Sequence, residues 1–212
     1  MGAAADCEAI ASGFLGQPIN ALSTIAFLVA GAWLVLQRPR ARWVGIGLVA
    51  TGVGSFLFHG PMPSGNEWAH DVSLAWLLAL IAGFGTRWKG LSRVPALLVL
   101  TAVMAFAPMA ADPIAVLLSV FAVASILWRE RSWATIGPLL LVGAAGVYGK
   151  LGATGGPLCD PASIWQPHAV WHIVAATGVV WLETLRFPPF CEDPLAAYAR
   201  VNLQRTEPPA LL

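Results

Sequence analysis

Charged residues are scarce in this 212-residue chain: they make up 11% of it, against about 25% in a typical soluble domain. A soluble, nucleic-acid-binding or disordered protein is therefore excluded, and a net charge of +1 provides no field that would attract polyanions. The sequence also lacks internal repeats, a glycine-rich phosphate loop and an acidic tract. What it has is 58% hydrophobic residues, with ten Trp, sixteen Pro and twenty-one Gly. This composition is typical of helices that pack closely in a bilayer and anchor at its surface.

Seven mostly apolar stretches lie between clusters of charge, and each is near the length that a membrane-crossing helix needs. The sequence therefore predicts an all-α membrane protein, a bundle of seven transmembrane helices. The predicted crossings are Asn20–Leu36, Val44–Phe58, Asp71–Gly85, Val94–Ala110, Ile114–Trp128, Thr135–Gly149 and Pro167–Leu185. Glycines in the second and sixth stretches, including Gly45 and Gly143, are expected to permit close helix contact.

The cations support this count because eleven of the twelve fall on the same side of the predicted membrane. The positive-inside rule makes that side cytoplasmic, so the N-terminus is predicted outside and the C-terminus inside. Only Lys150 falls on the other side. We expect residues 1–187 to form the transmembrane domain and residues 188–212 a loosely ordered, proline-containing cytoplasmic tail, and no signal peptide is visible. The eleven cations are Arg38, Arg40, Arg42, Arg87, Lys89, Arg93, Arg129, Arg131, Arg186, Arg200 and Arg205.

Ionisable residues inside predicted crossings are costly and mark functional sites by default. Ser55 and His59 stand four residues apart at the end of the second crossing, and His168 and His172 repeat this spacing at the start of the seventh. Each pair therefore shares one helical face. Asp71 opens the third crossing, and the topology places all five residues in the outer half of the membrane.

Three imidazoles from two helices are a plausible zinc set, because catalytic zinc commonly takes three protein ligands and a water. Zinc lowers the pKa of its water to about 7 and polarises a carbonyl. Asp71 could orient that water and carry its proton, and Ser55 could donate to the developing oxyanion. The alternatives are histidines that only lie at the membrane surface and an Asp71 that only caps a helix. His70 is expected to be interfacial or to support the site from behind.

These motifs resemble the alkaline ceramidase family, which belongs with the adiponectin-receptor-like seven-span hydrolases. The resemblance rests on S-F-L-F-H at 55–59, Asp71, H-A-V-W-H at 168–172, Cys7 with Glu8, and Q-P-I-N-A-L-S at 17–23. It implies a zinc-dependent amidase within the bilayer that cleaves ceramide into a sphingoid base and a fatty acid. By position, it implies that His59, His168 and His172 bind zinc and that Ser55 and Asp71 are catalytic or orient the ligands.

The family resembled also has a Ca2+ site in its N-terminal segment, and this sequence departs from it. Glu8 matches, but Ile10 replaces an amide-bearing residue and Gln17 replaces a glutamate, while Asp6 is shifted by one position. Two interpretations stay open. Asp6, Glu8 and Gln17 form a calcium site, or the two acidic residues are solvated charges of an external tail.

The resemblance further implies a disulfide between Cys7 and Cys159, because family members carry a comparable link. Both residues fall on the predicted external side, whereas Cys191 falls inside. In an oxidising compartment this bond would tie the N-terminal tail to the loop before the seventh crossing. The alternative is two free thiols.

The sequence thus predicts a multi-pass membrane hydrolase of a ceramide-like lipid amide, with its site toward the non-cytoplasmic leaflet. Membrane lipids are its expected surroundings, nucleic acid is not an expected partner, and the oligomeric state is left open. Two rival interpretations remain: a hydrolase of this architecture acting on an ester or another N-acyl lipid, and a non-enzymatic receptor or transporter with a metal site.

Overall fold

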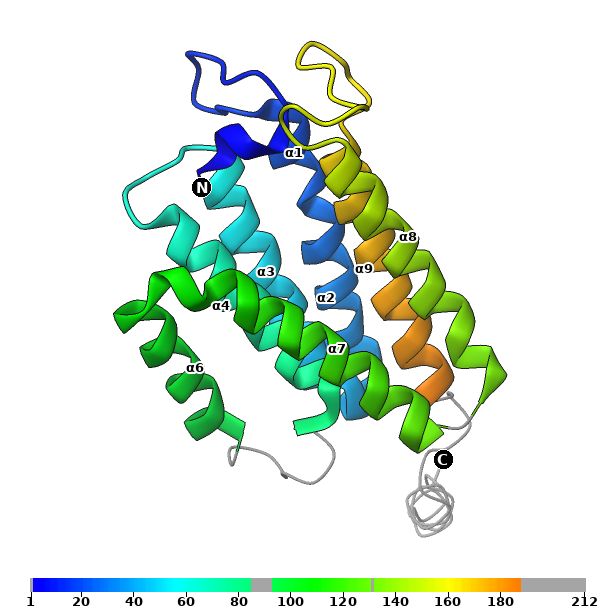
Figure 1. The fold of residues 1–212 in the computed structure, drawn as a ribbon. Helices are drawn as coiled ribbons and strands as arrows, with labels where there is room; N and C mark the ends of the chain where they lie inside the picture. Colours follow the sequence, from blue (N-terminus) through cyan, green and yellow to red (C-terminus); the bar gives the residue numbers. More distant parts are fainter. Residues whose placement is uncertain (1, 85–92, 131, 188–212) are drawn as a thin grey trace, which may run out of the picture.

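A computed structural model of the chain describes residues 2–84, 93–130 and 132–187 (Figure 1). The predicted tail, 188–212, lies outside the described residues, and so do Cys191 and five of the cations assigned to the cytoplasmic side. Those five are Arg87, Lys89, Arg131, Arg200 and Arg205.

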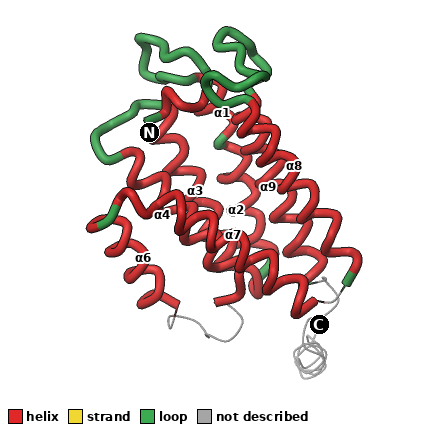
Figure 2. The backbone as a smooth tube through the Cα atoms, in the orientation of Figure 1, coloured by secondary structure: helices red, strands yellow, loops and turns green. Residues whose placement is uncertain are grey.

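The described residues form helices, turns and loops without a strand (Figure 2). Short 3-10 turns lie at Ala3–Asp6 (η1), Pro39–Ala41, Pro108–Ala110 and Trp133–Thr135, and a π-helical turn at Leu80–Phe84 extends α4. The α-helices are α1 Pro18–Ser23, α2 Ile25–Gln37, α3 Arg42–His59, α4 Asn66–Ala79, α6 Val94–Phe106, α7 Ala111–Glu130, α8 Ile136–Leu151 and α9 Pro167–Arg186.

The helices alternate in direction along the chain (Figure 1). Helices α2, α4, α7 and α9 run away from the end of the bundle that carries the N-terminal segment (residues 2–23), whereas α3 and α8 return to that end and α6 runs part of the way back. Proline in the first turn opens α1, α6 and α9, where its missing N–H is not needed. This alternation brings the end of α3 and the start of α9 to the same end of the bundle.

The all-helical expectation is confirmed for the described residues, and each of the seven predicted ranges contains a helix. Four helical stretches within the described residues are long and apolar enough to cross a membrane, which indicates a membrane protein. They are Pro18–Gln37, Pro39–His59, Pro108–Glu130 and Trp133–Leu151. Seven crossings, and their orientation, remain predictions.

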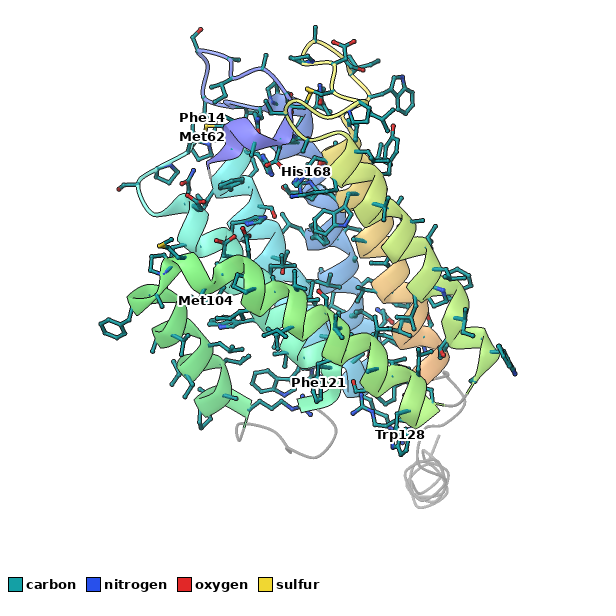
Figure 3. All side chains as sticks on the ribbon, in the orientation of Figure 1. Phe14, Met62, Met104, Phe121, Trp128 and His168 are labelled. Atoms are coloured by element: carbon teal, nitrogen blue, oxygen red, sulfur yellow. A yellow bond between two sulfur atoms is a disulfide. The ribbon has the colours of Figure 1, made fainter. Side chains whose placement is uncertain are left out.

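Apolar side chains cover much of the outer surface of the bundle. On α7, Leu117 and Val120 are more than 60% exposed, and Leu140 on α8 is 67% exposed. Such continuous apolar faces are rare on soluble monomers and typical of helices in contact with lipid. Figure 3 shows Phe121 and Trp128 on α7, which are also among the exposed hydrophobic residues.

Close helix contact through glycine is confirmed for the second predicted crossing but not throughout the sixth. Gly45 on α3 faces the backbone of α2 at Gly31 so closely that a side chain would collide with it. A Cβ atom at Gly143 on α8, in contrast, would meet nothing within 4 Å. The expectation for Gly143 is therefore wrong, because that position of α8 faces open space.

The N-terminal segment and the loop before α9 lie together above one end of the bundle (Figure 1). The expected disulfide joins them, from Cys7 to Cys159. Thr154 adds hydrogen bonds to the same junction: its Oγ1 accepts from the N–H of Cys7 at 3.0 Å, and its own N–H donates to the carbonyl of Ala5 at 2.9 Å. The two segments, 152 residues apart in sequence at the disulfide, thus form one cap over this end.

We expect a Cys7→Ser variant to lose about 2–4 kcal/mol of stability, because the bond closes a long loop and so restrains the unfolded chain. Thermal unfolding in detergent would measure this, with and without reductant. Reductant should lower the midpoint of the wild-type protein and leave that of the variant unchanged. Equal sensitivity of the two proteins would contradict a disulfide at this position.

Candidate metal centre

Three histidines converge at the capped end of the bundle. His59 is the last residue of α3, and His168 and His172 lie on successive turns at the start of α9. One ligand atom from each lies within 4.8 Å of the others, and the two Nε2 atoms of His59 and His168 are 3.2 Å apart. His59 and His172 are fully buried. The three residues predicted as a metal-binding set are therefore brought together, and Figure 3 labels His168 where α9 meets the N-terminal segment.

Each imidazole is held through its other ring nitrogen, Nδ1, by a different residue of the N-terminal segment. The Nδ1 atom of His59 lies 2.7 Å from Oε1 of Gln17. Likewise, Nδ1 of His172 lies 2.7 Å from Oγ of Ser23. The third partner is Asp6, whose Oδ1 lies 3.3 Å from Nδ1 of His168.

These partners determine which ring nitrogen carries the proton. The amide nitrogen of Gln17 donates to the carbonyls of Ala3 and Glu8, both at 2.8 Å, so its oxygen must face His59 and accept. The Ser23 hydroxyl uses its one proton on the carbonyl of Asn20, so it too accepts from the imidazole. A carboxylate such as Asp6 can only accept. These contacts favour the tautomer with the proton on Nδ1 for each of the three histidines.

The three Nε2 atoms are then the ring nitrogens without a proton. The Nε2 atoms of His59 and His168 are both acceptors at 3.2 Å, and Nε2 of His172 is buried without a hydrogen-bond partner among the described residues. Two facing acceptors repel, and a buried unsatisfied acceptor costs about 1–3 kcal/mol. A cation bound by all three nitrogens would remove both penalties, so this donor set fits a metal ion.

Asp6 is the last residue of the 3-10 turn η1, in the cap over the end of the bundle. Burial raises the pKa of its carboxyl group to about 6, while the nearby His70 and Lys150 lower it. Its Oδ1 lies 3.3 Å from Nδ1 of His168.

Ser55 and Asp71, predicted as catalytic, lie on the helices that flank the histidines. Ser55 is fully buried one turn before His59, and its Oγ has no hydrogen-bond partner among the described residues. Asp71 binds Nδ1 of His70 at 2.9 Å. Helix α4 begins at Asn66 with Gly65 as its cap, so Asp71 lies in the second turn and does not cap the helix.

His70 lies beside the cluster of three histidines, in agreement with one of its two expected placements. Its ring stacks on Phe58, with centroids 4.8 Å apart, and its centroid lies 6.4 Å from that of His59. The Asp71–His70 pair therefore forms a polar group adjacent to the cluster.

The residues considered for calcium have other partners here. Both carboxylate oxygens of Glu8 accept backbone N–H groups at the start of α1, from Ile19 at 2.7 Å and Asn20 at 2.8 Å. Glu8 is 6% exposed, so the alternative of a solvated charge is wrong for it. Gln17 and Asp6 contact His59 and His168. These contacts give the three residues partners within the chain in place of a shared calcium ion.

Sequence reasoning assigned no role to Ser23 and gave Asp6 and Gln17 a different one. A signal was present, because Gln17, Asn20 and Ser23 recur every three residues at the start of an otherwise apolar stretch. This spacing places them on one helical face, where polar groups need partners inside the bundle.

An apolar cavity of about 320 Å³ lies between α4, α7, α8 and α9, and Trp171 is one of its lining residues. Trp171 also contacts two of the histidines. The centroid of its ring is 5.6 Å from that of His168 and 5.4 Å from that of His172. The volume is within the range of small-molecule sites. Among its lining residues are Leu74, Leu78, Val123, Leu139, Val142 and Trp171.

Comparisons of the chain with protein-family models, with curated proteins and with solved structures find no match.

Proposed function

We propose that the protein is an intramembrane zinc-dependent amidase that hydrolyses the N-acyl bond of ceramide or a related lipid amide. The observation that carries this proposal is the convergence of one ligand nitrogen each from His59, His168 and His172, all within 4.8 Å of one another. Its resemblance to the alkaline ceramidases, in S-F-L-F-H, Asp71 and H-A-V-W-H, adds to this support. In the proposed orientation, seven crossings place this end of the bundle at the non-cytoplasmic leaflet.

Zinc is the proposed ion because neutral imidazoles are among its preferred ligands and three of them leave a position for water. When bound, it would polarise a carbonyl oxygen and make water acidic enough to attack at neutral pH. The residues of the chain then have distinct tasks. The histidines hold the ion, the unpaired Oγ of buried Ser55 can donate to the carbonyl oxygen, and Asp71 with His70 can move a proton.

The reaction adds water across the amide bond. The oxygen of water bonds to the acyl carbon, the C–N bond breaks, and the nitrogen takes up a proton. The products are a fatty acid and a sphingoid-type amine. Trp171 lines an apolar cavity whose walls offer few polar atoms. This cavity favours a substrate with a long hydrocarbon chain.

Purified protein in lipid nanodiscs, incubated with a synthetic ceramide, is expected to release fatty acid and sphingoid base in equal amounts. A chelator should abolish release, and added Zn2+ should restore it, with both products followed by mass spectrometry. A matched ester and an N-acyl ethanolamine would serve as competing substrates. Faster cleavage of either would assign another lipid hydrolase, and no product from any lipid in zinc-loaded protein would contradict hydrolysis.

A further inference from the structure

We propose that Gln17, Asp6 and Ser23 are positioning residues of the metal centre and that the N-terminal segment acts as its outer support. The inference rests on the proposed metal site, and it concerns residues that do not themselves bind the ion. Each of the three contacts one histidine through Nδ1 and thereby directs Nε2 of that histidine toward the shared centre.

Metal-binding histidines commonly donate their second N–H to an oxygen, and removing such a partner typically weakens metal binding 10–100-fold. The partner fixes the tautomer and the ring orientation. Here the three partners come from one stretch of 18 residues, 6–23, whereas the histidines come from two helices more than 100 residues apart in sequence. One local segment thus orients ligands that the long-range fold brings together.

Gln17 is the most constrained of the three. Its side chain is fully buried, and two carbonyl groups hold its amide nitrogen, so its oxygen cannot turn away from His59. The backbone reinforces this contact, because the N–H of Gln17 donates to the carbonyl of His59 at 2.8 Å. The neighbouring residues are bonded in the same way, because the N–H of Gly16 donates to the carbonyl of Gly60 at 2.9 Å. Gln17 therefore holds both the backbone and the ring of His59.

The cap keeps this segment on the histidines. Cys7 lies next to Asp6 and is bonded to Cys159, in the loop that leads into α9. The N–H of Ala9 donates to the carbonyl of Pro161 in the same loop, at 3.1 Å. The N-terminal segment is thus bonded to the loop that leads into α9, the helix that carries His168 and His172.

The test compares two glutamines that differ in one respect. Gln166 is also fully buried, and its amide nitrogen also donates to two backbone carbonyls, of Asp160 and Ser163. Its oxygen, however, has no hydrogen-bond partner among the described residues. Gln17→Leu and Gln166→Leu therefore remove similar structural bonds, but only the first removes the acceptor of a histidine.

Affinity for Zn2+, measured by competition with a chromophoric chelator, should fall 10–100-fold in Gln17→Leu and change less than about threefold in Gln166→Leu. The visible absorption of bound Co2+ reports ligand geometry and should shift only in Gln17→Leu. Gln17→Glu keeps an acceptor oxygen for His59 but loses both bonds of the amide nitrogen, so it should recover part of the affinity. Equal effects of the two leucine variants, or no effect of Gln17→Leu, would overturn the proposal.

Ser23 provides a second test if Gln17→Leu does not fold, because its side chain is only partly buried. Ser23→Ala should weaken Zn2+ binding about tenfold, and Ser23→Thr, which keeps the hydroxyl group, should restore it. Loss of affinity in both variants, or in neither, would contradict a positioning role. Wild-type protein that binds no metal would refute the metal centre itself, whereas normal binding in every variant would refute only the outer support.

Discussion

Replacing His172 with alanine is expected to remove both the bound zinc and the hydrolytic activity. Zinc sites in proteins commonly have at least three protein ligands, and this variant would keep only two imidazoles. Zinc content should therefore fall from about one ion per chain to near zero. A metal ion contributes several kcal/mol to the stabilisation of a polarised carbonyl, so its loss should slow hydrolysis about a thousandfold or more. Elemental analysis of purified protein, together with product release from ceramide, measures the two effects separately.

His70→Ala is the matched control for zinc content. Its ring lies beside the cluster, but its Nδ1 binds Asp71 and it is not among the three converging histidines. Zinc content should therefore persist in this variant. His172 is fully buried against Phe27, with ring centroids 5.4 Å apart, so circular dichroism must first show that His172→Ala is folded. A folded His172→Ala protein with its full zinc content would exclude this histidine as a ligand.

The convergence of the three histidines could be predicted because it follows from two simple periodicities. A spacing of four places His168 and His172 on one helical face, and the alternation of apolar stretches with charge clusters puts the end of one helix and the start of another at the same level. Neither step requires knowledge of how the helices pack. The three histidines do come together among the described residues, whereas the membrane orientation assumed in the second step stays a prediction.

The partners of those histidines could not be predicted in the same way. They lie on a segment that only partly follows a helix, and Cys7 has a positive φ of 70°, so no periodicity carries Asp6 to His168. The amide of Gln17 could serve a metal or a histidine equally well, and only the carbonyls of Ala3 and Glu8 decide its orientation. Such choices depend on long-range contacts that a linear pattern does not contain.

Helix boundaries were predicted least well where polar residues sit inside helices. The third crossing is expected to begin at Asp71, but α4 begins at Asn66, directly after the left-handed Gly65, so Glu67 and His70 lie inside the helix. The first predicted crossing is interrupted at Thr24, between α1 and α2, where the Thr24 hydroxyl donates to the carbonyl of Ala21 at 2.7 Å. Side chains that compete for backbone hydrogen bonds account for this break.

Substituting Gly45 with alanine is expected to destabilise the protein, although the same change usually stabilises a helix. In an open helix, alanine gains about 0.5–1 kcal/mol over glycine. At Gly45, however, a Cβ atom would lie 2.8 Å from the carbonyl oxygen of Gly31 and 2.9 Å from the backbone nitrogen of Val35, both on α2. Backbone atoms cannot move aside as a flexible side chain can, and overpacking costs about 1–3 kcal/mol.

Gly143→Ala on α8 is the matched control, because a Cβ atom there would meet nothing within 4 Å. The two variants should therefore shift the thermal midpoint in opposite directions, down for Gly45→Ala and up or unchanged for Gly143→Ala, measured in the same detergent. Helix α3 carries His59, and Gln17, which contacts His59, precedes α2 in the chain. Forcing α2 and α3 apart should therefore also weaken Zn2+ binding, in Gly45→Ala alone. A midpoint for Gly45→Ala at or above that of wild type would mean that the two helices do not meet backbone to backbone at this crossing.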